Sequence, residues 1–209
     1  MRSEEVVIPA GSAGLPGFLT LPEGGGGIVA FAHGSGSSRH SPRNRFVAEA
    51  LHEAGLGTLL FDLLTPVEER DRANVFDIPL LGSRLAAAAD WIHRTVPDAP
   101  LGFFGASTGA GAALWAAAEP KTKVAAVVSR GGRPDLAAER LPLVEAPTLL
   151  IVGSRDTVVV ELNRSALEQL RCESRLELVA GATHLFEEPG ALEEVARLAR
   201  EWFVDHLTT

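Results

Sequence analysis

The sequence predicts an α/β protein built on a doubly wound, mostly parallel sheet flanked by helices. Short apolar runs of strand length recur along the chain, and helical segments separate them. Apolar runs without polar alternation are typical of strands buried on both faces, and strand–helix alternation implies right-handed crossovers between parallel strands. The hydrophobic content of 46% is ample for a core on each side of such a sheet.

The elements follow in order along the chain. Segments 4–10 and 15–22, separated by GSAG, are expected to pair as a hairpin. Ser41-Pro42 predicts a helix start, with serine as cap and proline at the first position, and Gly55 predicts its end. A long polar loop is expected over 65–77 and an irregular connection over 130–146. The other expected strands lie at 27–34, 57–63, 101–105, 123–129, 147–153 and 174–181, and the helices at 41–55, 79–95, 107–118, 158–171 and 191–206.

Length and composition favour one domain, residues 1–209, without a break in composition or a repeat. The formal net charge of −8 argues against nucleic acid as a partner, because a phosphate-binding face must be basic. It also disfavours an anionic membrane surface. A small-molecule substrate or a protein partner remains, and the sequence does not separate a monomer from a homo-oligomer.

The single cysteine, Cys172, cannot form an intramolecular disulfide and is expected to be an inert thiol. The chain opens with a strand-like segment rather than a basic-then-apolar leader. Its longest weakly polar run, 106–118, is shorter than the ~20 residues that cross a bilayer. We therefore expect a soluble cytoplasmic protein.

In open parallel sheets, ligands bind where loops leave the carboxyl ends of the strands. One such loop, Gly105-Ala106-Ser107-Thr108-Gly109, matches the nucleophile-elbow pattern G-x-S-x-G between an apolar strand and a helix. The glycines allow strand and helix to approach closely, and the serine hydroxyl then lies at a helix N-terminus. Serine is also a common helix cap, so these five residues leave a capping role open.

Two further side chains favour catalysis. Asp156 follows the strand at 147–153, and His184 follows the last strand. Both are expected at the same rim as Ser107, where histidine would be the base and aspartate would orient it. Each has an ordinary alternative, a helix cap for Asp156 and a surface position for His184. The chain order Ser, Asp, His is the one expected of an α/β-hydrolase.

The glycine-rich loop HGSGSS, residues 33–38, supplies a candidate oxyanion hole. We expect the backbone N–H groups of Ser35 and Thr108 to be its donors. His33 precedes them on a loop that does not suit the base of the triad, so a structural role is expected for it. No cluster shows metal-ligand spacing, and no cofactor is expected.

The same loop partly matches the dinucleotide fingerprint G-x-G-x-x-G. Arg39, however, occupies the position of the third glycine, and Asp62 follows Gly36 by 26 residues rather than about 20. The segment 105–111 lacks the Lys-Ser/Thr ending of a phosphate-binding loop. These departures disfavour nucleotide binding.

Arg130 and Arg133 flank two glycines at the carboxyl end of a strand, beside the predicted site. A guanidinium there could bind a substrate carboxylate or phosphate, which makes Arg130 a candidate substrate-binding residue. A surface ion pair with Asp135 or Glu139 explains the arginines equally well. The mixed charges of residues 65–73 predict a solvated flap bordering the cleft.

Taken together, HGSGSS, FDLLTP, GASTG, VSRGGRPDL, GSRD and GATHLF resemble the dienelactone-hydrolase-like branch of the α/β-hydrolase superfamily, over about Val6 to Leu207. The resemblance implies a minimal α/β-hydrolase fold and a triad of Ser107, Asp156 and His184. Dienelactone hydrolases proper use a cysteine nucleophile, so lactone hydrolysis does not follow. Many relatives insert a helical lid after the sixth strand, where this chain has only 17 residues, Arg130 to Ala146. A shallow, partly open pocket is therefore expected.

The sequence thus predicts a serine hydrolase that cleaves a small carboxylic ester or thioester through an acyl-enzyme. Two alternatives stay open. The same triad could transfer the acyl group to an alcohol or thiol, or the chain could be a non-catalytic binding module on a hydrolase scaffold.

Overall fold

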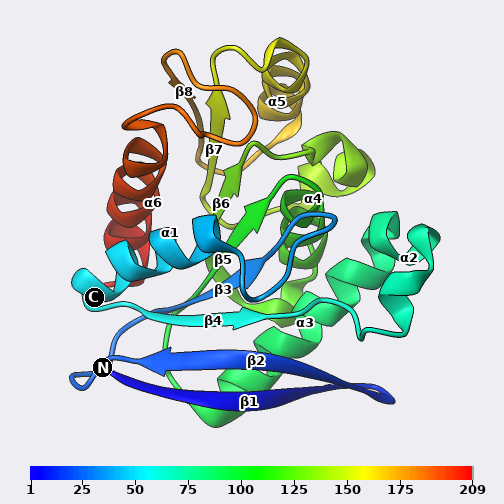
Figure 1. The fold of residues 1–209 in the computed structure, drawn as a ribbon, viewed down its shortest axis with the longest axis vertical. Helices are drawn as coiled ribbons and strands as arrows, with labels where there is room; N and C mark the ends of the chain where they lie inside the picture. The colour runs from blue at the N-terminus through cyan, green and yellow to red at the C-terminus, as the bar shows by residue number, and fades with distance from the viewer. Residues whose placement is uncertain (209) are drawn as a thin grey trace.

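The computed structural model describes residues 1–208, which form an eight-stranded sheet in the order β1-β2-β4-β3-β5-β6-β7-β8 (Figure 1). β2 pairs antiparallel with β1 and with β4, and every other neighbouring pair is parallel. The predicted mostly parallel sheet and the hairpin are confirmed. The strands are β1 (Arg2–Ala10), β2 (Ala13–Leu21), β3 (Ile28–Ala32), β4 (Gly57–Phe61), β5 (Leu101–Ala106), β6 (Val124–Arg130), β7 (Thr148–Gly153) and β8 (Ser174–Val179).

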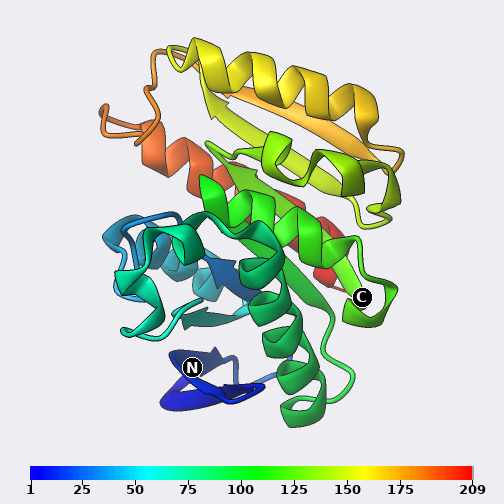
Figure 2. The same ribbon diagram turned by 90° about the vertical axis from the view of Figure 1, so that its right-hand side faces the viewer.

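Helices cover both faces of the sheet, and Figure 2 looks onto one face, with some helices in front of the strands and others behind them. One face carries α1 (Pro42–Glu53) and α6 (Ala191–Leu207), and the other carries α3 (Ile78–Thr95), α4 (Thr108–Ala117) and α5 (Thr157–Gln169). Each face therefore has its own apolar core, and the central strands β3, β4, β5 and β7 are buried along their whole length. Their unbroken apolar runs follow from burial on both faces.

Two segments expected to be irregular contain short helices. The segment 65–77 holds η1 (Glu68–Arg70) and α2 (Arg72–Phe76), and the connection after β6 holds η3 (Pro134–Leu143). Asp71 and Asp77 explain the first case, because their carboxylates accept bonds from Ala73 N and Leu80 N and cap the helices that follow. The cap at Asp77 also places the start of α3 at Ile78, one residue before the expected Pro79.

The connection after β6 packs on the body of the protein rather than forming a lid. η3 contacts both α4 and α5, and Pro134, Ala137 and Leu141 are its buried residues. The carboxyl ends of β3, β5, β6, β7 and β8 therefore open onto one uncovered rim. None of the helices described is long and apolar enough to cross a membrane.

Candidate active site

Ser107 is the single residue between β5 and α4. Its backbone lies at φ 52° and ψ −119°, a region that non-glycine residues rarely occupy. Its own N–H donates to Arg130 O at 3.1 Å, and its carbonyl accepts from Arg133 N at 3.1 Å, so the neighbouring strand β6 and its loop fix the turn. Within residues 1–208 the side chain makes no helix-capping bond, which leaves the hydroxyl free for other partners.

The flanking glycines allow the close approach that the turn requires. A Cβ atom at Gly105 would lie 2.4 Å from Ala110 Cα, and one at Gly109 would lie 2.1 Å from Ala32 O. Both distances are far inside van der Waals contact, so any larger residue would push α4 away from β3 and β5. The elbow is therefore defined by backbone packing as well as by the serine.

The hydroxyl of Ser107 is the end of a hydrogen-bonded series of three residues. Ser107 Oγ lies 3.3 Å from His184 Nε2, and His184 Nδ1 lies 2.6 Å from Asp156 Oδ2. Asp156 stands between β7 and α5 and makes no capping bond among the described residues, so its carboxylate is directed to the imidazole. His184 lies in the loop after β8. The structure thus brings together all three residues that the sequence proposed as a triad.

The hydrogen bonds define the tautomer of His184 that suits a base. A carboxylate can only accept, so Nδ1 carries the proton and Nε2 is the acceptor for the Ser107 hydroxyl. The imidazole is partly exposed, with a side-chain accessibility of 39%, whereas the Asp156 side chain is only 16% accessible. This arrangement can remove a proton from Ser107 and keep the resulting imidazolium paired.

His33 fixes the loop after β3. Its Nε2 accepts from Leu63 N at 3.1 Å, so its Nδ1 carries the proton and donates to Gly34 O at 3.0 Å. Burial lowers the pKa of His33 below its ordinary value. Both ring nitrogens are therefore engaged in holding the loop to the end of β4, as expected for a structural histidine.

Ser35 and Thr108, the expected oxyanion donors, lie side by side, and the N–H of Ser35 is already bonded to the Thr108 side chain. Ser35 N donates to Thr108 Oγ1 at 2.9 Å. Gly34 brings this loop against the elbow, since a Cβ there would lie 3.1 Å from Ala106 O and 3.2 Å from Ser107 Cβ. The loop is close enough to contact a group bound at Ser107, but one of the two expected donors, the N–H of Ser35, is bonded to the Thr108 hydroxyl.

A cleft of about 230 Å³ opens at Ser107. The loop after β3, the first turn of α1, Ser107, Arg130 and His184 line it. A neighbouring hollow of about 620 Å³ shares Ser35 and Arg43 with it and extends to Glu69 and Val75. The segment 65–77 therefore borders this neighbouring hollow and does not line the cleft at Ser107 itself, and Glu68 is paired with Arg84 rather than solvated as the flap interpretation expected.

Arg130 and Arg133 have different environments. The Arg133 guanidinium makes a two-bond pair with Asp135, at 2.8 and 2.7 Å, which matches the surface-pair interpretation. Arg130 is only 7% exposed and has no ion pair or side-chain hydrogen bond within the described chain. Its guanidinium lies 5.8 Å from the centre of the Phe186 ring. Burial, and secondarily the nearby charge of Arg43, lowers the pKa of Arg130 to about 10.

The first turn of α1 was not among the residues expected at the site. Its sequence indicates only a helix start, yet Ser41, Arg43 and Asn44 line the cleft beside Ser107. The parallel pairing of β3 with β5 explains this, because it places the loop after β3, and the helix that follows, next to the elbow. Only the strand order, which the sequence does not contain locally, could have indicated it.

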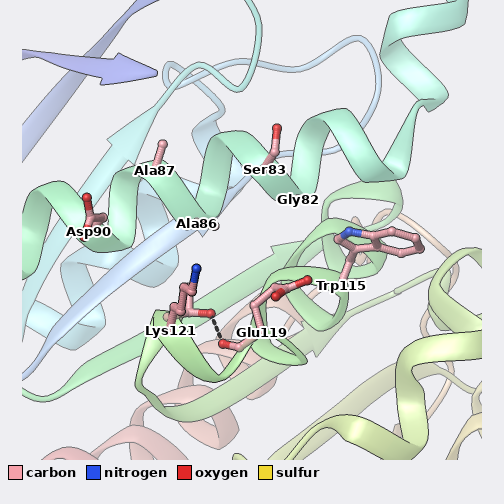
Figure 3. A pocket seen from close by; sticks show the side chains of 9 residues that line it. Gly82, Ser83, Ala86, Ala87, Asp90, Trp115, Glu119 and Lys121 are labelled. Atoms are coloured by element: carbon pink, nitrogen blue, oxygen red, sulfur yellow. Dashed lines mark hydrogen bonds between the residues drawn. The ribbon is translucent and has the colours of Figure 1, made fainter. Parts of the chain in front are cut away.

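A third hollow lies away from Ser107. It measures about 470 Å³ and lies between α3 and α4, with Gly82, Ser83, Trp115, Glu119 and Lys121 among its lining residues. Figure 3 shows Trp115 and Glu119 on one side and the small residues of α3 on the other. Over residues 1–208, no group of three or more histidine, cysteine, aspartate or glutamate residues is placed to hold a metal ion.

Known proteins resemble this chain over nearly its whole length. A dienelactone hydrolase from Anabaena variabilis is 56% identical and superimposes with a TM-score of 0.95. The match covers 99% of this chain and 98% of that one. A lidless α/β serine hydrolase from Xanthomonas campestris shares the fold, with a TM-score of 0.79 and 21% identity over 100% of this chain and 97% of that one.

Two Mycobacterium tuberculosis proteins that carry the name putative phosphoribosyl transferase are 63% identical over 99% of this chain. This chain matches 47% of each, so it spans about half the length of these curated relatives.

A family model described as an alpha/beta hydrolase domain matches residues 26–198. This range runs from just before β3 into α6 and includes the elbow, Asp156 and His184. The chain belongs to the alpha/beta hydrolase family.

Proposed function

We propose that this protein is a serine hydrolase that cleaves a carboxylic ester or thioester of a small substrate. One observation carries the proposal: Asp156, His184 and Ser107 form a continuous hydrogen-bonded series. Its last member is a partly exposed serine at a strained turn, and the side chain of this serine makes no helix-capping bond among the described residues. A structural serine would not need this base, this orienting acid and this backbone geometry together.

In the proposed reaction, His184 Nε2 takes the proton from Ser107 Oγ as the oxygen attacks the acyl carbonyl. Asp156 holds Nδ1–H and stabilises the imidazolium that forms. The tetrahedral intermediate collapses to an acyl-enzyme, and the leaving alcohol or thiol receives the proton from His184. Water, deprotonated by the same imidazole, then attacks the acyl carbon and releases the acid and Ser107.

The oxyanion would accept from the N–H groups of Thr108 and Ser35. Thr108 begins α4, so its N–H is one of the first-turn donors without a partner inside the helix. The N–H of Ser35 faces Thr108 Oγ1 before the reaction. An oxyanion would have to replace the hydroxyl as acceptor, and a negative charge accepts more strongly than a neutral hydroxyl.

The open rim favours a small substrate. The cleft of about 230 Å³ is below the size of most drug-sized ligand sites. Because η3 packs on α4 and α5, the connection after β6 leaves the rim uncovered.

The same observations support a small-molecule ester as partner in preference to nucleic acid or a membrane surface, given the net charge of −8. We also infer that residues 1–208 form one domain, because a single sheet joins all their strands. We infer a cytoplasmic location because the one cysteine of this chain forms no disulfide within it.

The name of the Mycobacterium tuberculosis relatives belongs to proteins of which this chain matches 47%. Our proposal rests instead on the residues of this chain.

Sequence alone also left open acyl transfer to an alcohol or thiol, and the product formed at rising acceptor concentration separates transfer from hydrolysis.

Replacing the nucleophile tests the proposal. Ser107→Ala is expected to lower kcat for small p-nitrophenyl esters by several orders of magnitude and to abolish labelling by a fluorophosphonate probe. Ser83→Ala, which alters an exposed serine on α3, is the matched control and should retain both. Undiminished turnover by folded Ser107→Ala, or a wild-type protein that the probe does not label, would reject the serine mechanism.

A further inference from the structure

A buried cation without a partner stands beside the proposed nucleophile. Arg130 is the last residue of β6, and its Cα is paired with that of Ala106, immediately before Ser107. Its side chain is more than nine-tenths buried, and Nε is a fully buried donor with no acceptor among residues 1–208. Folded proteins pair or neutralise buried charges, because an isolated one loses its hydration without compensation.

The Arg130 side chain lies on the cleft side of the sheet. Side chains alternate along a strand, and its neighbour Ser129 points toward α4, since a Cβ at Gly132 would lie both 1.9 Å from Ser129 Oγ and 2.6 Å from the Cβ of Ala110 in α4. Arg130 therefore points to the opposite face, where Phe186 packs beneath its guanidinium and Ser107 and His184 share the same cleft. The ring supports the cation but supplies no hydrogen-bond acceptor.

A second guanidinium faces the same cleft. Arg43 lies in the first turn of α1 and lowers the pKa of Arg130 through charge repulsion. Its only ion pair among the described residues is a long contact of 3.9 Å to Glu187, an exposed carboxylate. Its Nε is also buried without a partner. Two like charges thus converge on one cleft, and the described chain offers Arg130 no carboxylate to offset them.

We propose that Arg130 and Arg43 form an anion subsite that binds a carboxylate or phosphate group carried by the substrate ester, so that the preferred substrates are negatively charged esters. The inference rests on the proposed hydrolase function. An oxyanion between the guanidinium groups would pair with both cations and offset the repulsion between the two charges. The N-terminus of α1, which carries Arg43, favours negative charge at the same place.

Arg133 shows how a structural arginine is paired with a carboxylate in this protein. It lies three residues from Arg130, just before η3, and its guanidinium makes two hydrogen bonds to the Asp135 carboxylate. Within residues 1–208, the chain therefore provides a carboxylate for Arg133 and none for Arg130. A structural role for Arg130 would be expected to show the same kind of pairing.

The test compares two esters of equal carbon number, p-nitrophenyl glutarate and p-nitrophenyl pentanoate, which differ in a terminal carboxylate. We expect Arg130→Gln to lower the ratio of kcat/KM for glutarate to that for pentanoate by about 10- to 100-fold, the range of a charge-assisted hydrogen bond. Arg43→Gln, a more exposed change, should lower the ratio in the same direction. Arg133→Gln is the matched control and should leave the ratio unchanged.

Competition identifies the anion. Glutarate and inorganic phosphate, each at constant ionic strength, are tested as inhibitors of pentanoate hydrolysis. Inhibition by either that weakens in Arg43→Gln supports the subsite and names carboxylate or phosphate as its ligand. Inhibition by neither, together with an unchanged ester ratio in folded Arg130→Gln and Arg43→Gln, overturns it.

The subsite and the hydrolase function fail in different ways. If wild-type protein turns over both esters and the arginine variants keep the same ratio, the subsite is wrong and the hydrolase stands. If no ester is turned over, the hydrolase is wrong. In that case the rise in Tm caused by phosphate or glutarate still tests the subsite, because an anion bound only to the folded state stabilises it. That rise should shrink in Arg43→Gln and persist in Arg133→Gln.

Discussion

Ser107 occupies a conformation that a serine adopts only where its surroundings enforce it. The residue belongs to neither β5 nor α4, and backbone hydrogen bonds with Arg130 and Arg133 hold it in place. The sequence could indicate this residue because the glycines of the G-x-S-x-G pattern are the residue types that a tight strand-to-helix turn requires. It could not indicate that Ser35 N–H already binds Thr108 Oγ1, because that contact depends on how two loops meet.

Asp156→Asn tests the orienting role at the residue scale. The amide cannot stabilise an imidazolium as a carboxylate does, and its N–H₂ group favours the wrong tautomer of His184. We expect kcat to fall about 10⁴-fold, the loss that the same substitution causes in a serine protease triad, with a small change in the free energy of unfolding. Steady-state kinetics and urea unfolding measure the two effects.

Asp90→Asn is the control for that substitution, since Asp90 is an exposed residue of α3 that pairs with Arg94. It should retain wild-type kinetics. An Asp156→Asn enzyme within tenfold of wild type would show that the carboxylate does not orient the base.

At the scale of elements, the packing of α4 on the sheet was predictable and the short helices were not. The glycines of the elbow indicate close contact directly, and the structure confirms it at Gly105 and Gly109. Residues 72–76 form a helix too short to show a hydrophobic period, and η3 contains Pro142 inside its range. Their ends are set by caps and by tertiary packing, which no periodic pattern records.

Gly109→Ala should damage both stability and activity. The new methyl group would lie 2.1 Å from Ala32 O, which is backbone and cannot rotate away. We expect the free energy of unfolding to fall by roughly 1–3 kcal/mol, the usual cost of overpacking, and kcat to fall because the elbow moves. Gly24→Ala is the control, because nothing lies within 4 Å of a Cβ there, and urea unfolding of both variants decides the point.

Arg84 anchors the segment 65–77 to the body of the protein. Its guanidinium binds the carboxylate of Glu68 in η1 and the carbonyl of Ala10 at the end of β1. Arg84→Met is therefore expected to loosen the segment and to speed tryptic cleavage at the exposed Arg70 and Arg72. Arg94→Met, which removes an exposed arginine of the same helix, is the control, and equal cleavage rates in the two variants would contradict the anchoring role.

At the scale of the molecule, the class of fold could be predicted and the strand order could not. Strand–helix alternation requires parallel strands and helices on both faces, but it does not state which strands are neighbours. The observed order places β3 between β4 and β5, and this brings the loop after β3 and Arg43 to the cleft. The proposed triad and Arg130 were within reach of the sequence because each of these residues lies at or just after the end of a strand. The place of Arg43 at the cleft, by contrast, required the order of the sheet.

His33 links the stability of the whole protein to pH. Burial lowers the pKa of His33, so below its ordinary pKa of about 6.5 the unfolded chain binds a proton that the folded protein does not. The free energy of unfolding should therefore decrease as the pH falls below about 6.5, by at most about 1.4 kcal/mol per pH unit for one proton, until the lowered pKa is reached. His52, half-buried, also has a lowered pKa and acts in the same direction.

Urea unfolding at intervals between pH 7.5 and 5.5 measures this dependence. His33→Gln is expected to be less stable at pH 7.5, because the bonds to Gly34 and Leu63 change, but to lose less of its remaining stability as the pH falls. His52→Gln separates the contribution of the second histidine. The slope of the free energy of unfolding against pH is decisive, rather than its absolute value. A lost hydrogen bond lowers the free energy of unfolding at every pH, whereas only the loss of a titrating histidine reduces the slope. A slope in His33→Gln equal to that of wild type would show that His33 does not couple folding to pH.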